Sequence, residues 1–186
     1  EEDIKLYRAA LISQDYARAT IAVKLNVVRR FYAMAQARGY RPDNPAEGVR
    51  APRDRTDRRE RVKWLPLQAI RDLLEAPDPV TAKGKRDRAI LAAMAIHGLR
   101  VIEVARLQVG DLDPEARETG TLTVKGKGDK IRSVILVEQS AATLGRWLAV
   151  RPQVAAEGEG AFFVSLQRND GRGTQMSRYG IRKMVD

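Results

Sequence analysis

The chain has 186 residues, with 34 Lys and Arg against 24 Asp and Glu, a formal net charge of +10 and a pI near 10.2. It holds no Cys and one His, which excludes a disulfide scaffold, a thiol nucleophile and a zinc site built from Cys and His. The sequence shows neither the ~18-residue apolar run of a membrane span nor the start of a signal peptide. We therefore expect a cytoplasmic protein without a membrane partner, and the charge predicts a polyanion, most often nucleic acid.

Residues 1–50 predict a small helical unit. Within residues 17–38, apolar side chains recur at spacings of three and four, which is typical of one buried helix face: Ile21, Leu25, Val28, Tyr32 and Ala35. Ser13 or Asp15 would cap the start of this helix, and Gly39 would end it. A shorter apolar pattern at residues 4–12 predicts a helix before it.

The densest positive charge lies in residues 50–63, RAPRDRTDRRERVK, which hold seven Lys or Arg and three acids, a net charge of +4. Pro52 and the shortage of apolar side chains leave no face for a helix to bury, so we interpret residues 51–63 as an interdomain linker. A solvated surface loop is the alternative interpretation of such a charge run. Residues 1–63 carry a net +6 and residues 64–186 a net +4, so the linker would join two basic domains.

Residues 64–186 predict several helices and one hairpin. Pro66 suits a first helical residue and Pro77 an end, and the apolar periodicity indicates further helices at residues 86–97, 101–107, 140–150 and 177–185. Residues 121–124 and 131–137 are rich in Thr, Val and Ile and flank the turn KGKGDK, which indicates a β-hairpin, and residues 161–165 suit a short strand. The predicted fold class is mainly α with a small antiparallel β-sheet, an α+β domain that follows a helical domain.

One candidate site lies at residues 97–113, HGLRVIEVARLQVGDLD. Arg100 follows a Gly-Leu break between two predicted helices, so its side chain would project from a helix start, where unpaired N–H groups and the helix dipole favour anions. Its guanidinium offers a bidentate fork for phosphate. Glu103 stands three residues later and is placed to orient that guanidinium. Arginines at helix starts are common, so this pattern alone is weak.

A second candidate site is the hairpin VKGKGDKIR, residues 124–132. Lys125, Lys127, Lys130 and Arg132 crowd a turn whose glycines allow the backbone to approach a partner closely. A lysine at a hairpin tip can enter a groove and deliver a proton, since partial desolvation lowers the pKa of its ammonium. The residues alone favour this interpretation no more than an edge hairpin that lysines protect against aggregation.

The order of these pieces resembles the tyrosine recombinase (phage integrase) family. The resemblance lies in five stretches that together cover nearly the whole chain: TIAVKLNVVRRFYAMAQARGYRPDNPAEGVRAP (20–52), WLPLQAIRDLL (64–74), KRDRAILAAMAIHGLRVIEVARLQVGDLD (85–113), TLTVKGKGDKIRSVILVE (121–138) and LQRNDGRGTQMSRYGIRKMV (166–185). The box GLRVIEVARLQVGDLD followed by a GKGDKIR hairpin is specific as a combination, although neither half is decisive alone.

The resemblance implies a helical, SAM-like core-binding domain at residues 1–50 and the N-terminal part of a catalytic domain at residues 64–186, closed around double-stranded DNA. It implies that Arg100 binds the scissile phosphate, that Glu103 supports Arg100, and that Lys127 is the general acid for the leaving 5′-hydroxyl. Fixed guanidinium donors stabilise the charge of the transition state, and a phosphotyrosine intermediate stores the bond energy, so no metal or other cofactor is expected. The complete protein would self-associate as a tetramer on DNA and be associated with the nucleoid.

The predicted DNA-binding surface combines cations from both domains and the linker: Arg29, Arg30, Arg53, Arg55, Arg58, Arg59, Lys125, Lys130 and Arg132. The family's second half of the site, a His-x-x-Arg box followed by the Tyr nucleophile, is missing. The only histidine, His97, lies three residues before Arg100, where we expect it to close a helix, and Tyr179 precedes the place where the box belongs. We therefore expect a C-terminally truncated recombinase that binds duplex DNA without cleaving it. The alternatives are a non-catalytic DNA-binding protein of the same fold and a basic RNA-binding protein, although no RRM or KH signature is present.

Overall fold

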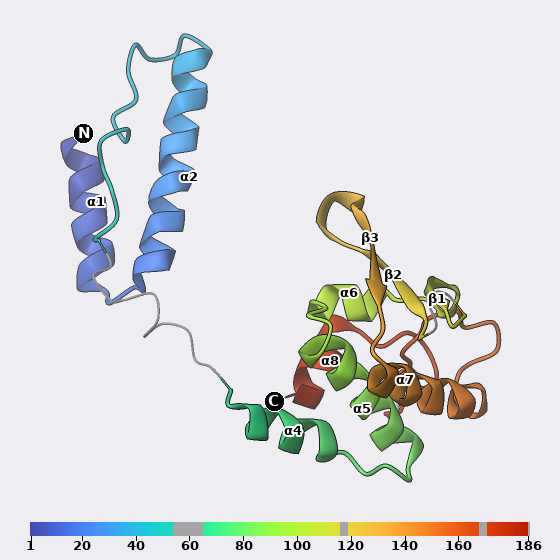
Figure 1. Cartoon of the computed structure of the whole chain (residues 1–186). Helices are drawn as coiled ribbons and strands as arrows, with labels where there is room; N and C mark the ends of the chain where they lie inside the picture. Colours follow the sequence, from blue (N-terminus) through green and yellow to red (C-terminus); the bar gives the residue numbers. More distant parts are fainter. Residues whose placement is uncertain (54–64, 116–118, 168–170, 186) are drawn as a thin grey trace. The chain divides into compact units, whose positions relative to one another are not determined.

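The computed structural model describes residues 1–53, 65–115, 119–167 and 171–185, and the chain divides into two compact units, Glu1–Lys63 and Trp64–Asp186 (Figure 1). The predicted linker at residues 51–63 lies mostly outside the described residues, together with Arg55, Arg58 and Arg59. Among the helices of the described ranges, none is long and apolar enough to cross a membrane.

The N-terminal unit is a pair of helices, α1 (Glu2–Ser13) and α2 (Arg18–Ala37), and the chain then returns along α1 (Figure 1). Its core is a single small cluster of buried apolar side chains: Ile4, Leu11, Ile21, Leu25, Ala46 and Val49. The apolar stripe predicted on the second helix is confirmed by the burial of Ile21 and Leu25. A small helical unit is therefore closed by the segment that follows α2.

The predicted cap of α2 is wrong. Ala17 occupies the N-cap position without a side-chain hydrogen bond, and the Ser13 hydroxyl instead donates to the carbonyl oxygen of Ala10 at 2.9 Å. The other end follows the sequence more closely, because Gly39 adopts φ +75° just after α2 and donates its N–H to Gln36. That left-handed conformation suits glycine, which has no Cβ to strain it.

The C-terminal unit contains the helices α4 (Leu67–Glu75), α5 (Ala82–Ala95), α6 (Val101–Arg106), α7 (Glu138–Val150) and α8 (Arg178–Val185). The described residues also form the 3₁₀ turns η1 (Val109–Asp111), η2 (Lys127–Asp129) and η3 (Arg151–Gln153). The sequence predicts these helices, but α5 begins four residues before its expected start. The Thr81 hydroxyl caps it, because it accepts a hydrogen bond from the N–H of Gly84 at 3.1 Å.

The core of this unit surrounds α5. Ala89, Ile90 and Ala93 of that helix are fully buried and belong to one cluster with Trp147 of α7 and Phe162 of the segment after it. The indole Nε1–H of Trp147 donates to the carbonyl oxygen of Phe162 at 2.8 Å, which satisfies its buried polar atom. Trp147 is therefore a packing residue of this core.

The sheet has three antiparallel strands in the order β1 (Leu112–Asp113), β2 (Thr121–Lys125) and β3 (Ile131–Ile135). The predicted hairpin is confirmed as β2 and β3, which project beyond α6 (Figure 1). The two-residue β1 was not predicted, and residues 161–165 form isolated bridges instead of a strand. The chain is thus mainly helical with a small antiparallel sheet, as predicted.

Two buried arginines of this unit bind backbone carbonyl oxygens in the segment that follows α7. Arg86 is 4% exposed; its Nε and Nη2 donate to Asp87 at 2.9 and 2.7 Å, and its Nη1 donates to the carbonyl oxygen of Val164 at 3.0 Å. Arg151 donates through Nε and Nη2 to the carbonyl oxygen of Ala161 at 2.9 and 2.6 Å. Both arginines replace the solvent partners of buried backbone oxygens, so their charges serve the fold.

Candidate functional site

The candidate site is built around the carboxylate of Glu103. Arg100 occupies the N-cap position of α6 in an extended conformation, and Glu103 is the third helical residue. Its Oε2 accepts the backbone N–H of Arg100 at 2.8 Å, which satisfies one of the free donors at the helix start. The i,i+3 pair of Arg100 and Glu103 expected from the sequence exists. Its acidic member is buried, since the side chain of Glu103 is 1% exposed.

The guanidinium of Arg100 is held by one edge only. Its Nη1 donates to Oε1 of Glu103 at 3.1 Å, while the side chain as a whole is 74% exposed. Guanidinium carries five N–H donors, so most of them face solvent at the start of α6. This arrangement can bind an anion such as a phosphate oxygen without first breaking the contact to Glu103.

A second arginine binds the same carboxylate from the sheet. Arg132 of β3 donates from Nη1 to Oε1 of Glu103 at 2.8 Å and from Nη2 to Oε2 at 2.9 Å, a bidentate pair. Arg132 is partly exposed, at 40% of its side chain. The sequence placed Arg132 among the DNA contacts, and the structure directs its fork to Glu103.

The electrostatics of this cluster follow from its geometry. The hydrogen bonds from Arg132 lower the pKa of Glu103 from 4.5 to about 2, with smaller contributions from the backbone and side chain of Arg100, although burial alone would raise it. The same contact raises the pKa of Arg132. Glu103 therefore stays ionised at neutral pH, and two arginines against one carboxylate leave a net positive charge at the start of α6.

The hairpin turn lies beside this cluster. A Cβ added to Gly126 would sit 3.5 Å from Oε1 of Glu103 and 3.7 Å from Nη1 of Arg132, so the backbone passes close to the pair just before residue 127. The N–H of Gly126 donates to the carbonyl oxygen of Lys130 at 2.8 Å and closes the turn. Lys127 is the first residue of η2, which places its backbone at this turn.

Lys125 and Lys130, which the sequence also assigned to DNA binding, are exposed on either side of η2. Gly128 and Asp129 between them adopt φ +70° and +55°, the left-handed region that lets the chain reverse tightly. The hairpin therefore presents exposed cations on a turn that begins against the Glu103 cluster.

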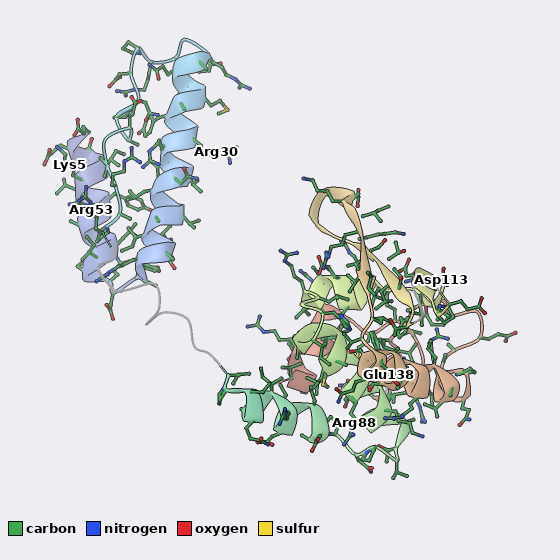
Figure 2. All side chains as sticks on the ribbon, in the orientation of Figure 1. Lys5, Arg30, Arg53, Arg88, Asp113 and Glu138 are labelled. Atoms are coloured by element: carbon green, nitrogen blue, oxygen red, sulfur yellow. The ribbon has the colours of Figure 1, made fainter. Side chains whose placement is uncertain are left out.

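The predicted cations of the N-terminal unit differ in their surroundings. Arg30 on α2 and Arg53 in the returning segment are exposed, and both are labelled in Figure 2. Arg29 is half-buried instead, and it donates to the carbonyl oxygens of Ala46 at 3.3 Å and Val49 at 2.9 Å. Arg29 therefore holds the segment after α2 against the helix, and its predicted contact with DNA is untested.

Cations of α8 belong to the exposed surface but were absent from the predicted set. Arg178, Arg182 and Lys183 are exposed, while Ile181 on the same helix is fully buried in the core. The spacing of the cations around that apolar residue in SRYGIRK was the available signal. The described residues contain no gathered group of three or more His, Cys, Asp or Glu side chains that could hold a metal ion.

Comparison with known proteins identifies relatives of the C-terminal unit and of most of the chain. The model of the phage integrase family matches residues 63–186. The tyrosine recombinase XerC of Vibrio parahaemolyticus serotype O3:K6 is 36% identical over 169 residues, which are 90% of this chain and 50% of that protein. XerC of Pelotomaculum thermopropionicum is 32% identical over 181 residues, 97% of this chain and 57% of that protein. The chain thus spans about half the length of the curated relatives it matches.

Solved structures resemble the fold at low sequence identity. A lambda integrase dimer bound to a COC′ core site aligns with a TM-score of 0.70 and 14% identity over 99% of this chain and 48% of that one. The Tn1549 transposon integrase in complex with circular intermediate DNA aligns with a TM-score of 0.69 and 15% identity, over 96% and 59%. At these identities the likeness establishes the fold.

Proposed function

The chain belongs to the phage integrase family of tyrosine recombinases, and on this premise we propose that it is the DNA-binding and phosphate-binding part of a site-specific DNA recombinase. The complete protein would break and rejoin strands of duplex DNA through a phosphotyrosine intermediate. One observation carries the proposal: the exposed guanidinium of Arg100 is anchored by the buried carboxylate of Glu103 at a helix start.

Arg100 would bind the scissile phosphate. During attack the phosphorus gains a fifth oxygen neighbour and its oxygens carry extra negative charge, which a fixed cation stabilises more in the transition state than in the ground state. The anchor at Glu103 supports this role, because a guanidinium already held at one edge needs little reorganisation when charge develops. Glu103 touches no reacting atom in this scheme and is a positioning residue.

Lys127 would donate a proton to the 5′-oxygen as its bond to phosphorus breaks, so that it leaves as a hydroxyl. Its place in the hairpin turn supports this assignment, since the turn begins against the same Glu103 cluster that holds Arg100. A general acid must lie within hydrogen-bond reach of the leaving oxygen, so the hairpin would have to follow the DNA backbone. The exposed Lys125 and Lys130 would bind neighbouring phosphates on either side of it.

The nucleophile would come from residues outside this chain. The family's Tyr follows a His-x-x-Arg box that comes after the first arginine. The only His here, His97, lies three residues before Arg100, which the proposal assigns as that first arginine, so no tyrosine of this chain follows a second box. This chain would supply the first arginine, Arg100, its supporting glutamate, Glu103, and the proton donor, Lys127. Duplex DNA is the proposed partner, with a tetramer on DNA as the active assembly of the longer protein and association with the nucleoid as its location.

The test uses a nicked suicide substrate, which traps a covalent protein–DNA adduct because the leaving strand diffuses away. In a longer protein that includes this chain, Arg100→Gln should slow adduct formation by about 10²–10³-fold, the usual cost of removing one donor to transition-state charge. Arg106→Gln is the matched control, since Arg106 is an exposed arginine at the other end of α6.

Equal adduct formation by Arg100→Gln and the unmodified protein would refute the role of Arg100. An adduct formed by the 186-residue chain alone would refute the proposal that its nucleophile lies elsewhere. Tight duplex binding by a longer protein that never forms an adduct would support the alternative, a DNA-binding protein of this fold without catalytic activity.

A further inference from the structure

We propose that Arg132 is a positioning residue that fixes Arg100 relative to the hairpin turn and that it makes no contact with DNA phosphate. The proposal rests on the proposed function, and it goes beyond that function because it assigns to Arg132 a task other than charge for the polyanion. It also predicts that two neighbouring cations of one hairpin, Lys130 and Arg132, differ in what they do.

The hydrogen bonds of Glu103 support this assignment. Each carboxylate oxygen is shared between the two arginines: Oε1 accepts from Nη1 of Arg132 at 2.8 Å and from Nη1 of Arg100 at 3.1 Å. Oε2 accepts from Nη2 of Arg132 at 2.9 Å and from the backbone N–H of Arg100 at 2.8 Å. A rotation of the carboxylate would therefore change both contacts of Arg100, and the fork of Arg132 prevents that rotation.

The burial of the charged carboxylate of Glu103 also supports a positioning role for Arg132. The carboxylate of Glu103 is 1% exposed while Arg132 covers it, so its partners are the two arginines and not solvent. If Arg132 is removed, the contact to Arg100 alone would remain, through one guanidinium nitrogen and one backbone N–H. The guanidinium of Arg100 would then keep its charge and its exposure, but the carboxylate that anchors it would no longer be fixed.

The hairpin is tied to the same cluster. Arg132 belongs to β3 and Glu103 to α6, so their bidentate pair bridges the sheet and the helix. Gly126 of the same hairpin passes close enough that an added Cβ would contact both side chains. Since Gly126 directly precedes Lys127, the pair of Arg132 and Glu103 sets the distance between Arg100 and the start of the turn.

Salt dependence distinguishes a positioning arginine from a phosphate contact. The affinity of the chain for a DNA duplex of about 30 base pairs would be measured from about 50 to about 200 mM salt, where each phosphate contact adds roughly 0.9 to the slope of log affinity against log salt. We expect Arg132→Gln and Arg132→Lys to keep the slope of the unmodified chain. Lys130→Gln is the matched control, and it should lower the slope by roughly one contact.

The second measurement follows the backbone amide of Arg100 by NMR hydrogen exchange without DNA, with the amide of Val124 in β2 as the reference for the fold. Because Glu103 would no longer be held by a fork, the amide of Arg100 should exchange at least about tenfold faster in both Arg132 variants, with Val124 unchanged. Lys cannot form two parallel bonds to a carboxylate, so Arg132→Lys should not restore protection, although it keeps the charge and the fold.

A slope lowered by Arg132→Gln as much as by Lys130→Gln would overturn the proposal, and so would unchanged exchange at Arg100 in both variants. Full protection of Arg100 in Arg132→Lys would also overturn it, since charge alone would then be sufficient. If the unmodified chain shows no salt-dependent affinity for the duplex, the proposed function fails, while the exchange measurement still decides whether Arg132 positions Arg100.

Discussion

Replacing Glu103 with Gln tests the centre of the site, because it keeps the size of the side chain and removes its charge. In the folded chain the pKa of Glu103 is lowered from 4.5 to about 2, mainly by the hydrogen bonds from Arg132. A difference of one pKa unit between the folded and unfolded states corresponds to about 1.36 kcal/mol, so the ionised carboxylate contributes about 3 kcal/mol to the free energy of unfolding at neutral pH. The neutral amide of the Glu103→Gln variant cannot make this contribution.

The sign of the pH dependence follows from the lowered pKa. The stabilisation is fully present above pH 4.5, where the carboxylate is ionised in both folded and unfolded states, and it is lost as the pH falls towards 2. The difference in stability between the unmodified chain and Glu103→Gln should therefore shrink by about 3 kcal/mol between about pH 6 and about pH 2. The other carboxyl groups titrate in both proteins, so their contributions cancel in the difference.

Urea unfolding at several pH values measures this difference. Both tryptophans of the chain belong to the C-terminal unit, so their fluorescence reports that unit alone, and a Trp64→Phe background leaves the signal to the fully buried Trp147. A difference in stability that stays constant across this pH range would contradict the lowered pKa of Glu103, and so would a Glu103→Gln variant as stable as the unmodified chain at neutral pH. Either result would mean that the two arginines do not hold an ionised carboxylate.

Arg29→Met should speed hydrogen exchange across residues 44–51, because two backbone carbonyl oxygens lose their donor at a cost of about 1–3 kcal/mol; Arg30→Met, at an exposed position, should change exchange little. Gly84→Ala should lower the Tm, because its Cβ would overlap the carbonyl oxygen of Asp78. Gly145→Ala in α7 meets nothing within 4 Å and should raise stability by roughly 0.5–1 kcal/mol. Equal changes in hydrogen exchange for Arg29→Met and Arg30→Met, or equal changes in Tm for Gly84→Ala and Gly145→Ala, would contradict the packing described.

The sequence predicts the helices and the hairpin because apolar side chains mark their buried faces, as Ile21 and Leu25 do on α2. The first and last residues of a helix are harder to predict, because they depend on single hydrogen bonds such as that from the N–H of Gly84 to the Thr81 hydroxyl. The two-residue strand β1 is too short to carry a periodic pattern, so its pairing with β2 arises from tertiary packing.

The candidate site is predicted in part. The spacing from Arg100 to Glu103 indicates their contact, since residues three apart share a helix face. Arg132 lies 29 residues beyond Glu103, and local spacing carries no information about that pair. The net charge likewise counts every arginine alike, although Arg29, Arg86, Arg132 and Arg151 bind groups of the protein itself.

The proposed function depends most on the binding of a DNA phosphate by the exposed guanidinium of Arg100. The most direct measurement is the affinity of the chain and of Arg100→Gln for duplex DNA as a function of salt. We expect a steep linear fall of log affinity with log salt for the unmodified chain and a slope lower by roughly 0.9 for Arg100→Gln, which loses one phosphate contact. A flat response of the unmodified chain, or equal slopes for the two proteins, would contradict this binding.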